Sequence, residues 1–220
     1  FKMELILYPF KNIVFNKNSV LLDASFLLSL IYDDDIKHSE CLSCLKLLSE
    51  RSCEYYISSM VFAEVLNQIL YKLFISDIQC RITNTKPYNS NDNIRYITNS
   101  FSRHDTKILK QKREDRLIHI PYKRYFDNIS KNSSKRNLLK IYYNKSVEII
   151  SEVEKIINIK YVNISEECMP LVKKIMCENL LSVNDAFHMA TAEYNKIEYL
   201  LTLDGDFVFA ESSEMKILKI

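Results

Sequence analysis

Short apolar runs alternate with segments of helical spacing in the first third of this 220-residue chain. Residues 20–23 and 55–58 are too short for amphipathic helices and too apolar for exposed loops, so we expect buried strands there. Helical spacing follows each run, at 26–31, 38–50 and 59–74. Strands separated by helices favour a parallel sheet that is covered on both faces. The alternation predicts an α/β protein, a three-layer α/β/α sandwich around a mainly parallel sheet.

The last third of the chain repeats this alternation. Strands are expected at 160–164, 198–203 and 215–220, and helices at 168–180 and from 182 onward. Both ends of the chain therefore contribute strands to the same predicted sheet.

Five carboxylates stand where these strands end or where a helix lies beside them: Asp23, Glu64, Asp185, Asp204 and Asp206. The carboxyl ends of parallel strands share one edge of a sheet, and binding sites lie beyond that edge. Carboxylates gathered there repel one another and resist desolvation, so such clusters usually bind hard cations such as Mg²⁺ or Mn²⁺. The pattern indicates metal-dependent chemistry on a phosphate.

Each carboxylate also has a simpler structural interpretation. Asp23 can cap the helix that follows it, and Asp185 can pair with Ser182 in a capping box. Glu64 can be a solvated edge residue, and Asp204 can open a turn. Any one of these interpretations suffices for a single residue, whereas their joint occurrence in one order favours a site.

Four blocks of the sequence set these carboxylates among small, hydroxyl and aromatic neighbours. The blocks are Leu22-Asp23-Ala24-Ser25, Ala63-Glu64, Asp185-Ala186-Phe187-His188-Met189-Ala190-Thr191-Ala192 and Leu201-Thr202-Leu203-Asp204-Gly205-Asp206-Phe207. In this order they resemble the PIN-domain family, the ribonuclease fold that includes VapC-type toxins of toxin-antitoxin systems. The resemblance covers about residues 19–75 and 158–220, and its last two blocks are the specific ones.

This resemblance implies an endoribonuclease that hydrolyses RNA phosphodiester bonds with metal-activated water. Asp23 and Asp185 are the implied principal ligands of Mg²⁺ or Mn²⁺. Glu64, Asp204 and Asp206 would complete the metal-binding cluster, directly or through water. The implied catalytic residues are Asp23, Glu64, Asp185 and Asp204.

Other residues of the same blocks have supporting expectations. The hydroxyls of Ser25 and Thr202 are placed to orient the carboxylates. His188 follows Asp185 by three residues and can share its helix face, but hard cations prefer oxygen ligands, so we expect a packed or half-exposed histidine there and not a ligand. The resemblance also implies a protein antitoxin and a homodimer as partners.

Two alternatives to a nuclease differ in class. A catalytically silent PIN module would bind RNA or a protein partner without cleaving RNA. An unrelated α/β phosphatase or nucleotide-binding domain is disfavoured, because Gly205 is the only glycine and no glycine-rich phosphate loop exists. A phosphatase motif of the Asp-x-Asp type also fails, since Ser25 stands two residues after Asp23.

A long segment, residues 76–157, separates the two parts of the predicted sheet domain, and we expect a basic, partly helical insertion there. Residues 74–140 hold 15 Lys and Arg against 6 Asp and Glu, a net charge of +9. Because the whole chain carries +2, the remainder carries −7. A basic insertion can hold phosphates beside an acidic site. The expected RNA-binding residues are Arg95, Arg103, Lys123 and Arg124.

Aromatic residues are interleaved with these cations, as base stacking beside phosphate contacts would require. They are Tyr88, Tyr96, Phe101, Tyr122, Tyr125 and Phe126. The alternative is a solvated helical hairpin or a partly disordered loop.

The spacing of the cysteines tests for a zinc site, and the hydropathy of the chain tests for a membrane span. His38, Cys41 and Cys44 are spaced three apart, a spacing that would suit a zinc site. However, the two cysteines also lie on an apolar helix stripe, and the sequence has no second Cys or His cluster to complete four zinc ligands. We therefore expect core packing and free thiols. The chain has no apolar run of the roughly 20 residues that a membrane span needs and no signal pattern at its start, which predicts a soluble, cytoplasmic protein.

Overall fold

The structure is a computed structural model that describes residues 4–11, 13–83, 94–111, 119–210 and 214–220. The chain divides into two compact units. The sheet unit comprises Phe1–Val65 and Glu152–Ile220, and the helical unit comprises Leu66–Ser151.

The sheet unit is built on one six-stranded sheet in which every pair of neighbouring strands is parallel. The strand order is β1-β6-β5-β2-β3-β4, so the chain adds strands to one side of β2 and later to the other. Leu22, the last residue of β2, pairs with Leu201 of β5, so the carboxyl ends of these two strands lie side by side. The bounds are β1 Leu5–Leu7, β2 Ser19–Leu22, β3 Glu54–Ser58, β4 Lys160–Val162, β5 Tyr199–Thr202 and β6 Lys216–Lys219.

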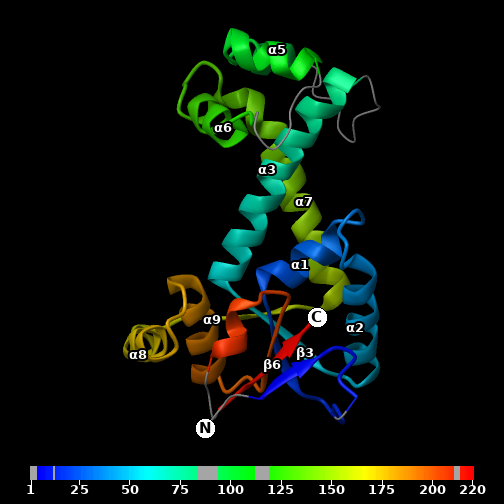
Figure 1. The fold of residues 1–220 in the computed structure, drawn as a ribbon, viewed down its shortest axis with the longest axis vertical. Helices are drawn as coiled ribbons and strands as arrows, with labels where there is room; N and C mark the ends of the chain where they lie inside the picture. Colours follow the sequence, from blue (N-terminus) through cyan, green and yellow to red (C-terminus); the bar gives the residue numbers. More distant parts are fainter. Residues whose placement is uncertain (1–3, 12, 84–93, 112–118, 211–213) are drawn as a thin grey trace. The chain divides into compact units, whose positions relative to one another are not determined.

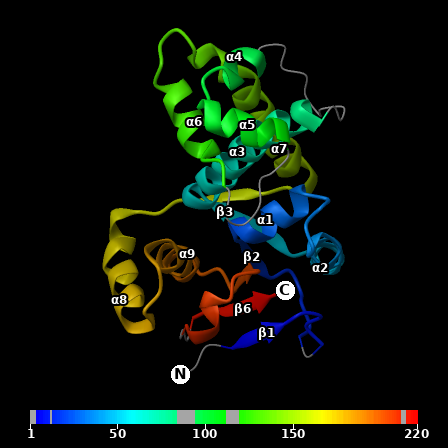
Figure 2. The ribbon, with the colours of Figure 1, turned by 45° about the horizontal axis from the view of Figure 1, so that its top comes forward.

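Helices cover both faces of this sheet (Figures 1 and 2). Helix α1 (Ala24–Ile31) packs on α2 (His38–Glu50) on one face. Helix α8 (Met169–Asn179) packs on α9 (Val183–Tyr194) on the other. The layers confirm the predicted α/β/α sandwich, and the sheet is wholly parallel.

The apolar composition of the strands follows from this double cover. Val20, Leu21 and Leu22 are all completely buried, although successive side chains of a strand point to opposite faces. Leu21 packs with Leu200 of β5 and Ile217 of β6 in a cluster that also contains buried apolar residues of α8 and α9. Small side chains, including Ala186 and Ala190, let α9 lie close to the sheet.

The described part of the helical unit has its own apolar core. Phe74 makes edge-to-face contacts with Phe126 and Tyr142, and the Tyr142 hydroxyl donates a 2.5 Å hydrogen bond to buried Asp77. The unit takes in parts of two helices that also enter the sheet unit, α3 (Ser59–Thr83) and α7 (Lys140–Ile157). Its other helices are α4 Ile94–Thr98, α5 Arg103–Gln111, α6 Tyr122–Ser130 and the 3₁₀ helix η1 Arg136–Leu139.

The elements and the unit boundaries differ from the sequence predictions in four respects. Strand β1 has no counterpart among the predicted strands, and α3 continues past residue 74 to Thr83. The helices α4, α5 and α6 lie where the sequence has little apolar periodicity. The division between the two units falls inside α3 and α7, earlier than the expected boundaries at residues 75 and 157.

Two further 3₁₀ helices, η2 (Glu166–Cys168) and η3 (Asp206–Phe209), connect elements of the sheet unit. Within the described ranges, no helix has both the length and the apolar composition that crossing a membrane requires.

Candidate active site

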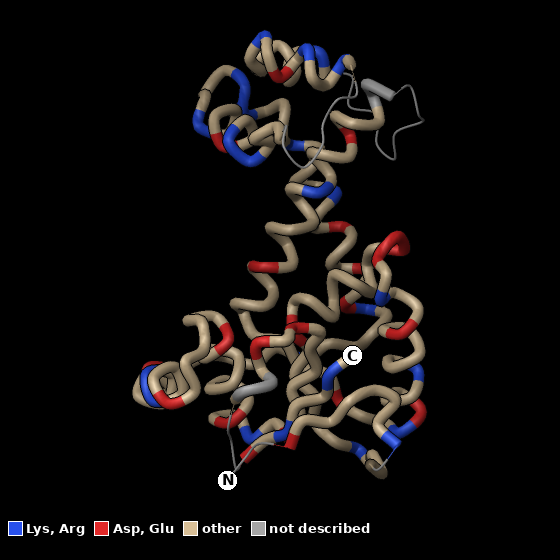
Figure 3. The backbone as a smooth tube through the Cα atoms, in the orientation of Figure 1, with Lys and Arg blue, Asp and Glu red and all other residues tan. Residues whose placement is uncertain are grey.

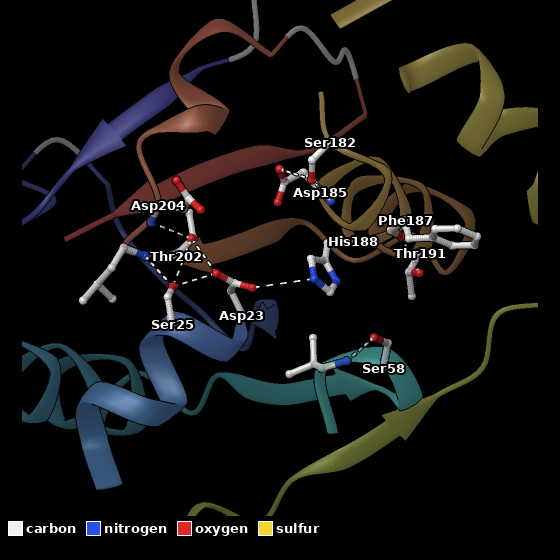
Figure 4. Close-up of polar contacts among 12 residues, drawn as sticks. Asp23, Ser25, Ser58, Ser182, Asp185, Phe187, His188, Thr191, Thr202 and Asp204 are labelled. Carbon is white, nitrogen blue, oxygen red and sulfur yellow. Dashed lines mark hydrogen bonds and ion pairs between the residues drawn. The ribbon is translucent and has the colours of Figure 1, made fainter. Parts of the chain in front are cut away.

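The candidate site lies where the strand order reverses, at the carboxyl ends of β2 and β5 (Figure 4). In a parallel sheet, this is the point at which the connections leave in opposite directions and open space for a ligand. Asp23 follows the last residue of β2, and Asp204 stands two residues beyond the end of β5. Topology therefore brings together residues that are far apart in the sequence.

Asp23 is the central carboxylate of the site and is only 7% exposed. It precedes α1 in the N-cap position, but its side chain makes no capping hydrogen bond. Instead, its Oδ2 accepts hydrogen bonds from Ser25 Oγ at 2.6 Å and from Thr202 Oγ1 at 2.7 Å. The capping interpretation is therefore wrong for Asp23.

Ser25 and Thr202 also fix the chain that leaves β5. Ser25 Oγ accepts from the backbone N–H of Leu203 at 3.1 Å, and Thr202 Oγ1 accepts from that of Asp204 at 2.9 Å. Each hydroxyl thus donates to Asp23 and accepts from the segment that carries Asp204. Hydrogen bonds to an ionised carboxylate are stronger than neutral ones, so the network holds Asp23 in one orientation.

Asp185 lies in the first turn of α9, on the other side of Asp23 from α1 (Figure 4). Ser182 caps the helix by accepting from the Asp185 N–H at 3.2 Å, and its hydroxyl donates to Asp185 Oδ2 at 2.6 Å. Burial raises the pKa of Asp185; the Ser182 hydrogen bond lowers it, and the charge of Asp204 raises it again. Ser182 caps α9, whereas the Asp185 carboxylate does not complete the expected capping box.

Glu64 reaches the site from α3, whose first turn is fixed by a 3.2 Å hydrogen bond from the Val61 N–H to buried Ser58 Oγ. Its carboxyl is half-buried. Burial raises the pKa of Glu64, and the charge of Asp23 raises it further, with smaller contributions from Asp185 and Asp204. The charges of the other carboxylates therefore act on Glu64, which is not a solvated edge residue.

Asp204 and Asp206 are both exposed, and they differ in their relation to the cluster. Asp204 Oδ1 accepts from the Asp206 N–H at 3.0 Å, which is the geometry of a side-chain-stabilised turn. The turn interpretation is thus correct for Asp204, whose charge also raises the pKa of Glu64 and Asp185. Asp206 is not among the charges that shift those two groups, so the structure joins four of the five predicted carboxylates and leaves Asp206 at the margin.

His188 belongs to the centre of the site, where the sequence predicted only a packed histidine. It is 2% exposed, and its Nε2 lies 3.8 Å from Asp23 Oδ1. A protonated His188 would oppose the rise in the pKa of both Glu64 and Asp185. The spacing of three residues from Asp185 is the sequence signal for this placement, since it puts both side chains on one helix face.

The donor chemistry of the site fits a hard divalent cation. Oxygen ligands suit Mg²⁺ and Mn²⁺, and a cation would relieve the repulsion that raises the pKa of Glu64 and Asp185. In the described ranges, however, no three His, Cys, Asp or Glu side chains form a group already able to hold a metal ion. An ion would have to draw the carboxylates together.

The cysteine cluster has a structural role. Cys41 and Cys44 are completely buried on α2, and burial raises the pKa of both thiols. His38 Nδ1 lies 2.9 Å from the carbonyl oxygen of Ser29 and pairs with the backbone. These contacts agree with core packing, which the apolar stripe predicted.

The four expected RNA-binding cations lie in the helical unit, and all are exposed. Lys123 and Arg124 line a hollow of about 580 Å³ together with Lys131. Arg103 lines a second hollow of about 510 Å³ with two further lysines, whereas Arg95 lies on α4 outside both. Lys and Arg are frequent along α5 and α6 (Figure 3).

The aromatic residues of this unit do not offer the stacking surface that their interleaving suggested. Phe101, Tyr122 and Phe126 are buried in the core of the helical unit, and Tyr125 stacks on Phe101 at 3.8 Å. Tyr96 is 64% exposed, and Tyr88 lies outside the described residues. Core packing therefore explains most of these aromatic positions.

A comparison with protein-family models points to the same fold family. The PIN domain model matches residues 129–211. The match supports a PIN-domain family and thus nuclease-type function in general. It includes Asp185, His188 and Asp204, whereas Asp23 and Glu64 lie before it. No curated protein matches the chain.

Proposed function

We propose that the chain is a metal-dependent endoribonuclease that hydrolyses RNA phosphodiester bonds at the carboxylate cluster of the sheet unit. The observation that carries this proposal is Asp23. It is a buried carboxylate at the strand reversal whose side chain caps no helix and whose orientation is fixed by two hydroxyls, which is typical of a functional site. The PIN match supplies the class of chemistry.

The four clustered carboxylates have distinct positions for this task. Asp23 and Asp185 approach from opposite sides of the β2–β5 junction and would be the principal ligands of Mg²⁺ or Mn²⁺ (Figure 4). Glu64 and Asp204 would complete the cluster, with Asp206 as an outer contact. A bound ion would lower the pKa of a water molecule and neutralise phosphate charge. Ser25 and Thr202 would keep Asp23 oriented.

RNA is the proposed substrate, and the helical unit is its proposed binding surface. Two hollows of this unit are lined by lysine and arginine, and Asp127, the single acidic residue lining these two, accepts a hydrogen bond from Tyr71 at 3.1 Å. The ammonium of Lys123 lies 5.5 Å from the centroid of the Tyr71 ring. Such hollows suit phosphate groups, whose contacts make binding dependent on salt.

A toxin role with a protein antitoxin, and a homodimer, are proposals that come from the family resemblance alone. One structural observation favours the silent-module alternative: no ready three-donor metal group exists in the described part of the chain. A silent module would bind RNA through the helical unit and would not cleave it.

Cleavage of a mixed pool of single-stranded and structured RNA distinguishes these two functions. Wild-type protein is assayed with Mn²⁺, Mg²⁺ or EDTA beside Asp23→Asn and the exposed-acid control Asp33→Asn. We expect cleavage by wild type and Asp33→Asn that EDTA abolishes, and none by Asp23→Asn. RNA binding without cleavage by a metal-loaded wild type would reject the nuclease in favour of the silent module.

A further inference from the structure

His188 is a buried polar group whose protein surroundings do not satisfy it. Its ring points toward Asp23 from α9 (Figure 4). The separation of 3.8 Å between Nε2 and Asp23 Oδ1 is too long for a hydrogen bond. Nδ1 is buried and has no hydrogen-bond partner among the described residues. An unsatisfied buried nitrogen usually marks an ordered water, which would orient the ring through Nδ1 and leave Nε2 to face Asp23.

The two carboxylate oxygens of Asp23 have different surroundings, so the carboxylate is held in one orientation. Oδ2 accepts both hydroxyl hydrogen bonds, from Ser25 and Thr202. Oδ1 faces His188. The hydroxyls thus fix the carboxylate so that its remaining oxygen and the imidazole nitrogen converge on the same space.

We propose that Asp23 Oδ1 and His188 Nε2 bind the same divalent cation, and that this mixed oxygen and nitrogen site selects Mn²⁺ over Mg²⁺. The inference rests on the proposed function, because it concerns the ion that the carboxylate cluster would hold. Adjacent donors that each lie about 2.1 Å from one ion in an octahedral site are roughly 3 Å apart. Asp23 Oδ1 and His188 Nε2, now 3.8 Å apart, would need to approach slightly to share an ion.

The selectivity follows from the chemistry of the imidazole. Mg²⁺ takes oxygen ligands and gives up its bound water reluctantly, whereas nitrogen ligands favour divalent transition metals. A carboxylate-only cluster would bind both ions through the same donors. Adding His188 Nε2 strengthens the site for Mn²⁺ alone.

The direct test is pulsed electron paramagnetic resonance of Mn²⁺ bound to protein labelled with ¹⁵N only at histidine. We expect a ¹⁵N coupling from one directly bound histidine, absent from unlabelled protein. The chain has four histidines, so the label is assigned with His188→Gln, which should remove the coupling. His104→Gln, at a histidine whose side chain is 80% exposed, should retain it.

Metal affinities give a second readout that does not depend on RNA cleavage. Calorimetry should show that His188→Gln weakens Mn²⁺ binding by at least about tenfold and leaves Mg²⁺ binding nearly unchanged. An equal loss for both ions would overturn the selectivity. If His188→Gln fails to fold, the absence of a ¹⁵N coupling in wild type would still overturn the role of His188.

The outcomes separate this inference from the proposed function. Mn²⁺ that binds wild type, is lost in Asp23→Asn and shows no ¹⁵N coupling would overturn the role of His188 and leave the carboxylate site intact. Failure of wild type to bind Mn²⁺ and Mg²⁺ at all would overturn both proposals.

Discussion

The sheet unit and the helical unit use charged residues in opposite ways. In the sheet unit, acidic side chains from four elements converge at one edge, and burial and mutual repulsion raise the pKa of Glu64 and Asp185. In the helical unit the aromatic residues fill the core, and the cations remain exposed around its hollows. Buried like charges point to an ion, whereas exposed cations point to a diffuse anionic partner. The proposed function rests on this difference, with chemistry in the sheet unit and RNA binding in the helical unit.

The largest expected effect is on cleavage and tests the sheet unit. Asp23→Asn should lower the rate of RNA cleavage by about 10³-fold, because the amide removes the negative charge that would hold the ion. The amide oxygen can still accept from the two hydroxyls, so we expect a melting temperature close to wild type. Cleavage is measured at saturating metal with Asp33→Asn as control. A rate in Asp23→Asn equal to that of wild type would show that Asp23 has no catalytic role.

The next effect tests whether the aromatic residues of the helical unit are core or contact surface. Phe126→Ala should lower the free energy of unfolding by about 3 kcal/mol, because it opens a cavity beside Phe74 and Tyr71. Tyr96→Ala, at an exposed site, should cost less than about 1 kcal/mol. Chemical denaturation measures both values. Equal stability of the two variants, with RNA binding weakened in Phe126→Ala, would restore the base-stacking interpretation.

A smaller effect tests the cations of the helical unit. Replacing Arg95, Arg103, Lys123 and Arg124 by Ala should weaken RNA binding by about tenfold or more at moderate salt and flatten its salt dependence. The matched control is Lys46→Ala with Arg51→Ala, which removes exposed cations from the sheet unit. Fluorescence anisotropy over a salt series gives both affinity and slope. A slope equal to that of wild type would exclude the helical unit as the RNA-binding surface.

The smallest effect concerns stability and pH. Glu64 and Asp185 have a raised pKa in the folded protein, so the folded state retains protons that the unfolded state has lost. Stability from these groups is complete below their unfolded pKa and is lost as pH rises through the folded value. In metal-free protein, Asp185→Asn should reduce this loss by less than about 1 kcal/mol. Melting curves from acidic to neutral pH would contradict the prediction if the variant lost more stability than wild type.

Much of the sheet unit can be predicted from local sequence patterns. The doubly buried strands β2 and β5 appear as short apolar runs, and the spacing over residues 38–50 predicts α2 with its observed bounds, His38–Glu50. The ends of the predicted strands locate Asp23 and Asp204 from the sequence alone. Edge strand β1 is only three residues long, too short for a period to be recognised.

The remaining features depend on tertiary packing. The short helices α4, α5 and α6 bury aromatic and aliphatic residues against α3 and α7, which a local pattern of mixed polarity conceals. The place of His188 at the centre of the site depends on how α9 packs against the sheet. Asp206 matches a motif, but the turn at Asp204 leaves its side chain exposed.

The division of labour between the two units is tested most directly by single-turnover cleavage rates measured over a range of RNA concentrations. Asp185→Asn should lower the maximal rate and leave the half-saturating RNA concentration unchanged. Lys123→Ala with Arg124→Ala should raise the half-saturating concentration and leave the maximal rate unchanged. If both variants lowered the maximal rate alike and left half-saturation alone, chemistry and RNA binding would not be divided between the sheet unit and the helical unit.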